Sequence, residues 1–145
     1  MDKIYDFQFI NKHQGYDAIN NPDRLNQSEL LPIGIKWKFN GTQYSIVNED
    51  GVIGVILEKR NELAIIEGMI SFTTNKAYIV NGKGDLLWNI GELLYKQKYV
   101  KTNRFFFVDN DKDSVYFLFN NSICDYRFSI DPITGEISDF YEVKW

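Results

Sequence analysis

The sequence has few of the residues on which covalent and metal chemistry depends. Its 145 residues include one cysteine, Cys124, and one histidine, His13. A single cysteine excludes an intramolecular disulfide and favours a reducing compartment. One residue of each type also excludes the set of cysteine and histidine ligands that a structural zinc ion requires.

Long apolar runs are missing as well. The first ten residues mix charged and apolar side chains, unlike the continuous apolar core of a secretion signal. No run reaches the roughly 18 apolar residues of a membrane span. We therefore expect a cytoplasmic protein without a membrane partner. The net charge of −4 argues against a nucleic-acid partner, because phosphate binding requires clustered cations.

The sequence around His13 and Cys124 does not favour catalysis. His13 lies in a polar segment, and we interpret it as a solvated loop histidine, although a lone histidine is chemically capable of base work near pH 7. Cys124 precedes Asp125, whereas a reactive thiolate requires positive neighbours, so we interpret the thiol as inert. We expect no catalytic residue, no cofactor and no enzymatic activity.

The acidic segment 109–113 starts like a calcium-binding loop, because aspartates stand at alternate positions. Such a loop requires glycine at its sixth position and glutamate at its twelfth, where this chain has Ser114 and Asn120. Its flanks are rich in phenylalanine, which is typical of strands. We interpret the segment as the tip of a hairpin and expect no bound metal.

Signals for strands and turns dominate the rest of the chain. Aromatic residues make up 16% of the sequence and favour pleated, half-buried surfaces. Four segments repeat a pattern of an apolar stretch followed by a turn that opens with Asn or Asp, and three of these turns contain a glycine three or four residues later: 44–53, 78–90, 106–116 and 128–137. These residues tolerate the left-handed backbone of tight turns, so each segment predicts a hairpin.

Alternation of apolar and polar residues predicts short antiparallel strands over 5–9, 35–39, 43–47, 52–57, 63–67, 69–73, 77–81, 86–90, 105–108, 114–120, 123–130 and 136–143. Segment 105–108 is apolar at every position, as expected for a strand buried on both faces. A short helix is predicted over 23–31, ended by Pro32. Segment 91–99 predicts either a two-turn helix or an irregular connector.

We therefore predict one all-β domain with minor helix over residues 1–145. Residues 1–32 hold a strand and an irregular segment, and 33–145 hold the hairpin series. An antiparallel meander satisfies this pattern when it is closed as a barrel, stacked as a sandwich or fanned into a small propeller-like assembly, because a long flat meander leaves open edges. The spacing between equivalent turn positions shrinks from 33 to 28 to 22 residues, which favours a twisted meander or barrel over a regular propeller.

Negative charge is concentrated in the C-terminal part. Residues 105–145 carry 3 Lys/Arg against 8 Asp/Glu, whereas residues 1–104 carry 13 against 12. The same 41 residues hold 11 of the 23 aromatic side chains. Tyrosine and tryptophan among acidic groups are typical of an interface for a basic protein. The alternative is a solvated acidic face that has no partner.

In size, charge and Asn/Lys/Ile/Phe/Tyr-rich composition the chain resembles the immunity proteins of bacterial polymorphic-toxin and contact-dependent growth inhibition systems, and 126–137 is the most similar segment. The resemblance implies a cytosolic monomer that forms a one-to-one complex with a basic toxin, often a nuclease, and covers its active site. On this hypothesis acidic groups speed association and aromatic anchors prolong the complex. The predicted partner-binding residues are Asp109, Asp111, Asp113, Tyr116, Asp125, Asp139, Tyr141 and Glu142.

A repeat-type β module that binds another protein or a small ligand is the alternative. The turn pattern is similar to that of bacterial Trp-Gly repeat proteins, although the Trp-Gly pairs themselves are missing. An enzyme is the third hypothesis. A deep apolar pocket with converging polar groups would favour ligand binding or catalysis over immunity.

Overall fold

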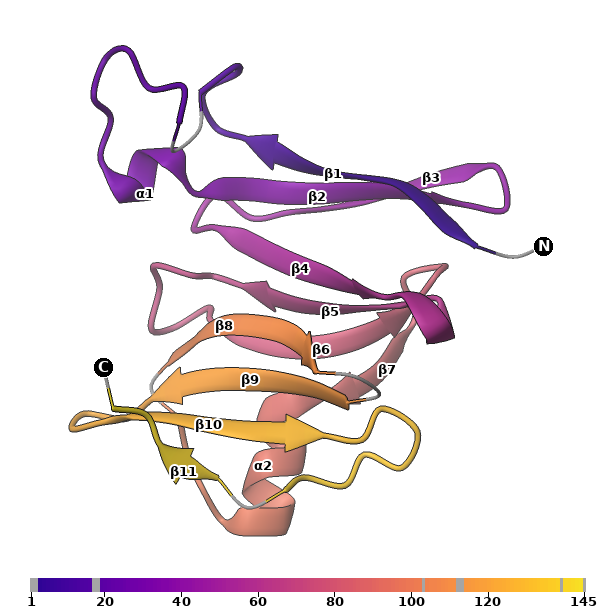
Figure 1. Cartoon of the computed structure of the whole chain (residues 1–145), viewed down its shortest axis with the longest axis vertical. Coiled ribbons are helices and arrows are strands. Elements are labelled where there is room, and N and C mark those ends of the chain that lie inside the picture. Colours follow the sequence, from indigo (N-terminus) through magenta and orange to yellow (C-terminus); the bar gives the residue numbers. More distant parts are fainter. Residues whose placement is uncertain (1–2, 17–18, 103, 112–113, 139, 145) are drawn as a thin grey trace.

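Three antiparallel sheets are stacked along the long axis of the molecule (Figure 1). The computed structural model describes residues 3–16, 19–102, 104–111, 114–138 and 140–144. The N-terminal sheet contains β1 (Ile4–Asn11), β2 (Pro32–Phe39) and β3 (Thr42–Val47). The central sheet contains β4 (Val52–Leu57), β5 (Glu62–Glu67), β6 (Lys76–Asn81) and β7 (Leu86–Asn89). The C-terminal sheet contains β8 (Arg104–Asp111), β9 (Ser114–Asn120), β10 (Asp125–Ile130) and β11 (Tyr141–Glu142).

Within each sheet the strands are neighbours in sequence order, so the chain is a meander. The described helical segments are α1 (Gln27–Leu30), the single 3₁₀ turn η1 (Glu58–Arg60) and α2 (Ile90–Lys98). The prediction of an all-β fold is confirmed. The sheets are stacked in layers, and a stacked assembly is one of the predicted arrangements. The described strands form a meander of three open sheets, and the barrel, one of the predicted ways of closing the meander, is not formed.

The central sheet is apolar on both faces. Along β5, Leu63 and Ile65 face the N-terminal sheet, where they join a cluster with Ile35 and Trp37. The alternate residues Ala64 and Ile66 face the C-terminal sheet and α2. Alternate side chains of a strand point to opposite faces, so a continuous apolar run indicates that both faces are covered.

The two sheet interfaces use a similar contact between a tryptophan and a glycine-containing turn. Trp37 Nε1 of the N-terminal sheet donates to the carbonyl of Gly82 in the central sheet at 2.8 Å. Trp88 Nε1 of the central sheet donates to the carbonyl of Pro132 in the C-terminal sheet at 2.9 Å. Each turn lies directly on an aromatic ring, because a Cβ built at Gly82 would overlap the Phe39 ring and one built at Gly135 would lie 2.8 Å from the Trp88 ring. Two of the predicted turns therefore hold the layers together.

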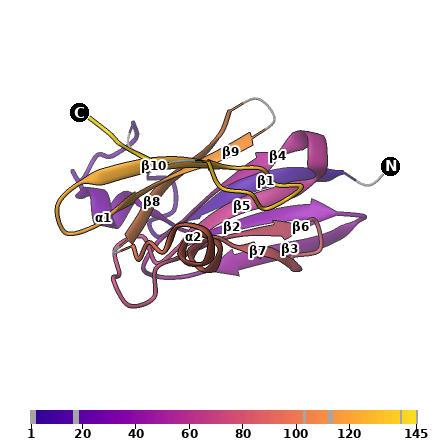
Figure 2. The same ribbon diagram turned by 90° about the horizontal axis from the view of Figure 1, so that it is seen from below.

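Helix α2 closes the space between the central and C-terminal sheets (Figure 2). The side chain of Asn89 caps its first turn by accepting a hydrogen bond from Glu92 N at 3.2 Å. Leu94 is fully buried against the sheets. Gln97 binds the loop after β10, since its Nε2 donates to Gly135 O at 2.7 Å and its Oε1 accepts from Ile137 N at 2.8 Å. Of the two predicted alternatives for this segment, the helix is formed. No helix among the described residues is both long and apolar enough to cross a bilayer.

Three predictions from the sequence are wrong. The turn at 48–51 connects β3 to β4, which lie in different sheets, and so does not close a hairpin. Segment 69–73 is a loop, in which Ser71 Oγ accepts from Thr73 N and Thr74 N at 3.2 and 3.0 Å. The strand predicted over 105–108 is not buried on both faces, because β8 is an edge strand with a bulge and Phe107 is 41% exposed.

The contact between Gly135 and Trp88 gives a stability test. Gly135 has a φ of 75°, and Gly41 has a φ of 79° with nothing within 4 Å of a built Cβ. We expect Gly41→Ala to lower the free energy of unfolding by about 1 kcal/mol, from the left-handed backbone alone. We expect Gly135→Ala to cost about 1–3 kcal/mol more, because the added methyl overpacks Trp88. Urea denaturation measures both, and equal losses would contradict the packing argument.

Candidate partner-binding site

The outer face of the C-terminal sheet carries most of the predicted partner-binding residues. The inner positions, such as Phe117 and Phe128, are fully buried in the core. The alternate positions point away from the core, and the strand register aligns them across neighbouring strands. We call this set the outer C-terminal face, and it consists of Phe107, Asp109, Asp111, Tyr116, Leu118, Asp125, Arg127 and Tyr141.

Aromatic and charged groups on this face are in contact with one another. The Arg127 guanidinium lies 3.8 Å from the centre of the Tyr116 ring, a cation–π contact. Arg127 Nη2 also lies 3.4 Å from Asp111 Oδ2. The rings of Phe107 and Tyr116 are 6.1 Å apart. Tyr141 is 56% exposed and is paired with Arg127 across β10 and β11.

The structure brings together Asp109, Asp111, Tyr116, Asp125 and Tyr141, but not all eight predicted residues. Glu142 is paired with Tyr126, whose ring packs on Phe140 on the other side of the sheet. The Glu142 carboxylate lies 3.6 Å from Lys144 Nζ. Glu142 therefore does not share the outer C-terminal face. Asp113 and Asp139 lie outside the described residues.

An acidic hollow of about 600 Å³ lies beside this face, between the β8–β9 hairpin and the loop after β10. Its carboxylates are those of Asp111, Asp131 and Glu136, and three serines contribute hydroxyl groups: Ser114, Ser129 and Ser138. Asp131 and Glu136 are not among the predicted site residues, because the sequence pattern indicates only that they open and close a turn. The sequence feature that points to them is the excess of acidic residues in 105–145, to which both contribute. In the described part of the chain no three His, Cys, Asp or Glu side chains are grouped as metal ligands.

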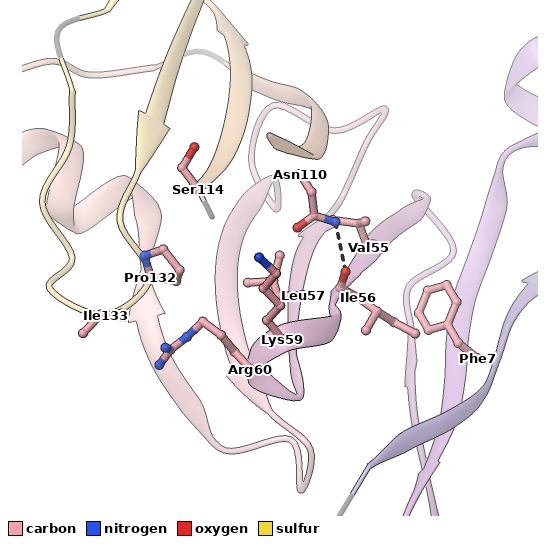
Figure 3. A pocket seen from close by; sticks show the side chains of 11 residues that line it. Phe7, Val55, Ile56, Leu57, Lys59, Arg60, Asn110, Ser114, Pro132 and Ile133 are labelled. Carbon is pink, nitrogen blue, oxygen red and sulfur yellow. Dashed lines mark hydrogen bonds between the residues drawn. The ribbon is translucent and has the colours of Figure 1, made fainter. Parts of the chain in front are cut away.

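A second hollow, a cleft of about 810 Å³, lies where the three sheets meet (Figure 3). Phe7 comes from the N-terminal sheet, and the run 54–57 comes from β4. Asn110 and Ile133 come from the C-terminal sheet and its loop. The lining is mainly apolar, and the polar side chains are those of Lys59, Arg60, Asn110 and Ser114. No sequence pattern predicts this cleft, because its walls come from segments that are far apart in the chain.

The single cysteine lies in the turn between β9 and β10, next to Glu142. Partial burial raises the pKa of the Cys124 thiol, and the neighbouring Glu142 carboxylate, which accepts its hydrogen bond, raises it further. Both effects disfavour the thiolate, which is the nucleophilic form. The prediction of an inert thiol agrees with this environment.

Neither the protein-family models nor the curated proteins include a match to this chain. Among solved structures, a chain from the structure of Tne2 in complex with Tni2 has a similar fold, with a TM-score of 0.67 over 97% of this chain and 99% of that chain. The two sequences are 16% identical, so the similarity concerns the fold alone. The fold is therefore shared with a component of a two-protein complex.

The environment of Cys124 predicts its reactivity. At pH 8 we expect the thiol to react with a disulfide reagent several-fold more slowly than a free cysteine, because its raised pKa leaves less thiolate. Glu142→Gln removes the negative charge next to the thiol and should speed the reaction, measured by stopped-flow absorbance. Glu136→Gln changes the same charge in a different loop and should leave the rate unchanged. A slower reaction in Glu142→Gln would contradict the assignment.

Proposed function

We propose that this chain is an immunity protein. It acts by binding rather than by catalysis, in the cytoplasm of a bacterium, and forms a one-to-one complex with a basic toxin domain. The toxin is held at the outer C-terminal face, so that its active site is covered. One observation carries this proposal. Exposed aromatic rings and carboxylates lie together on one face of the C-terminal sheet, and the opposite face packs in the core.

The chemistry of this face suits a basic protein partner. Asp109 and Asp111 lie on it, and the acidic hollow adds Asp131 and Glu136 at its end. Complementary charge of this kind raises association rates more than it lowers dissociation rates. Tyr141 and Phe107 are exposed aromatic residues. Aromatic side chains often carry much of the binding energy in protein interfaces.

The structural comparison supports the same type of function. The similar chain belongs to a complex of two different proteins, Tne2 and Tni2, and this pairing fits the resemblance to toxin–immunity systems seen in the sequence. An immunity protein requires a stable fold and one specific surface, and it requires no catalytic group.

Capture of the partner tests the proposal directly. The tagged protein is used to capture partners from its host lysate at low and at high salt. We expect one basic protein, retained better at low salt. Expression of that protein alone should arrest growth, and co-expression of this chain should restore it. Growth arrest by this chain itself, relieved by the captured partner, would reverse the assignment of toxin and immunity protein.

The acidic part of the surface should govern the association rate. Asp109→Lys is expected to slow association with the captured partner about 3- to 10-fold and to weaken its dependence on salt, because electrostatic steering is lost. Glu49→Lys changes the net charge equally at an exposed turn next to the N-terminal sheet and should have a smaller effect. Surface plasmon resonance at several salt concentrations measures both. Equal effects would move the interface elsewhere.

The aromatic part should govern the lifetime of the complex. Tyr141→Ala is expected to raise the dissociation rate about 10-fold, which corresponds to roughly 1.4 kcal/mol of binding free energy. Tyr95 on α2 is 50% exposed, close to the 56% of Tyr141, and Tyr95→Ala is the matched control. The same binding experiment compares the two variants. A complex that is weakened by Tyr95→Ala and not by Tyr141→Ala would contradict the proposed surface.

A further inference from the structure

The cleft where the three sheets meet follows the open edge of β4. In the order β4-β5-β6-β7, β4 has β5 as its strand neighbour on one side and is the edge of the sheet on the other. Four consecutive residues of β4, Gly54 to Leu57, line the cleft. The face of a strand presents every second residue, whereas its edge presents each residue in turn. The cleft is therefore bounded by the backbone edge of β4.

A hydrogen bond shows which backbone groups point into the cleft. Asn110 Nδ2 donates to Ile56 O at 2.9 Å, so this carbonyl points away from β5 (Figure 3). In an antiparallel ladder the N–H and C=O of one residue point to the same side, and this side is shared by every second residue. The N–H of Ile56 and both backbone groups of Gly54 consequently face the cleft. Val55 and Leu57 direct theirs toward β5.

The walls of the cleft define what else an occupant of this edge would contact. Phe7 lies on the side of the N-terminal sheet, and Pro132 and Ile133 lie on the side of the C-terminal sheet (Figure 3). Ile133 is 67% exposed, so its apolar side chain is accessible to an occupant of the cleft. At the end of β4, η1 brings two cationic side chains, Lys59 and Arg60, to the cleft, and Arg60 Nε lies 2.9 Å from Glu62 Oε1.

We propose that the cleft binds an extended apolar segment of the toxin, which pairs with β4 as an additional strand of the central sheet. The segment carries an acidic side chain that meets Lys59. Open backbone groups along an edge select a peptide main chain, and the apolar walls select its side chains. This inference rests on the proposed function and adds a second contact: the positive surface of the toxin meets the outer C-terminal face, and one extended segment enters the cleft.

Hydrogen exchange of the complex tests this pairing. In the free protein we expect the amides of Gly54 and Ile56 to exchange at least 10-fold faster than those of Val55 and Leu57, which bond to β5. Binding of the captured partner should slow Gly54 and Ile56 at least 10-fold. The readout is residue-resolved exchange by NMR, recorded with and without the partner.

Two variants change the edge without removing a bond to β5. Ile56→Pro removes one donor that faces the cleft and should weaken partner binding about 10-fold or more. Asn110→Ala frees the Ile56 carbonyl and should bind the partner at least as well as the parent. Circular dichroism and melting temperature report whether Ile56→Pro folds. If Ile56→Pro does not fold, the hydrogen-exchange measurement and the Lys59→Glu variant test the strand pairing instead.

The charge at the end of β4 gives a matched pair. Lys59→Glu should weaken partner binding about 5- to 10-fold, because it opposes the acidic side chain of the segment. Lys83→Glu changes an exposed lysine in the β6–β7 turn of the same sheet, and it should have little effect.

The outcomes separate this inference from the proposed function. A partner that binds tightly, protects the outer C-terminal face and leaves Gly54 and Ile56 unprotected overturns the inference alone. Protection of these amides by a small molecule, or by raising the concentration of the protein by itself, also overturns it, because the occupant is then a ligand or a second copy. Failure to capture any partner overturns the proposed function and this inference together.

Discussion

The structure depends on a central sheet that is apolar on both faces. Leu63 and Ile65 on one side, and Ala64 and Ile66 on the other, are fully buried, so neither face can be left to solvent. The N-terminal sheet covers the first face, and the C-terminal sheet with α2 covers the second. Two covering layers leave two outer faces, and these differ in character. The outer N-terminal face carries Lys36 and Lys38, which alternate with buried residues of β2, whereas the outer C-terminal face carries carboxylates and aromatic rings.

Local signals predicted the elements better than their arrangement. Turn chemistry identified the hairpin at Asn81–Asp85, and it also identified the turn at 48–51. Nothing in that last turn specifies that the following strand pairs with a later strand, because the same backbone conformation serves a hairpin and a connection between layers. The loop at 69–73 alternates like a strand, but Gly68, with a φ of 71°, ends β5, and the hydroxyl of Ser71 satisfies the next amides. The layered assembly follows from burial on both faces of β5, a property that the apolar run of Leu63 to Ile66 already displayed.

The candidate site was partly accessible from the sequence for the same reason. Period-two alternation places Asp109, Asp111 and Tyr116 on one face once the register is known, and their clustering in sequence made them visible. Glu142 lies on the opposite face from Tyr141, because successive residues of a strand alternate between the two faces. The cleft along β4 was not accessible, since Phe7 and Ile133 meet only through the stacking of all three sheets. Sequence patterns describe faces well and describe junctions between layers poorly.

Inner and outer positions alternate along the strands of the C-terminal sheet, and the two sets of residues are under different constraints. Residues at inner positions, such as Phe117 and Phe128, are constrained by close packing, and a change of one methylene group there affects stability. Residues at outer positions contact solvent or a partner, and most substitutions there leave the core intact. One strand can therefore keep its fold while every second residue changes to follow a new partner. A similar fold at only 16% identity is compatible with such a division.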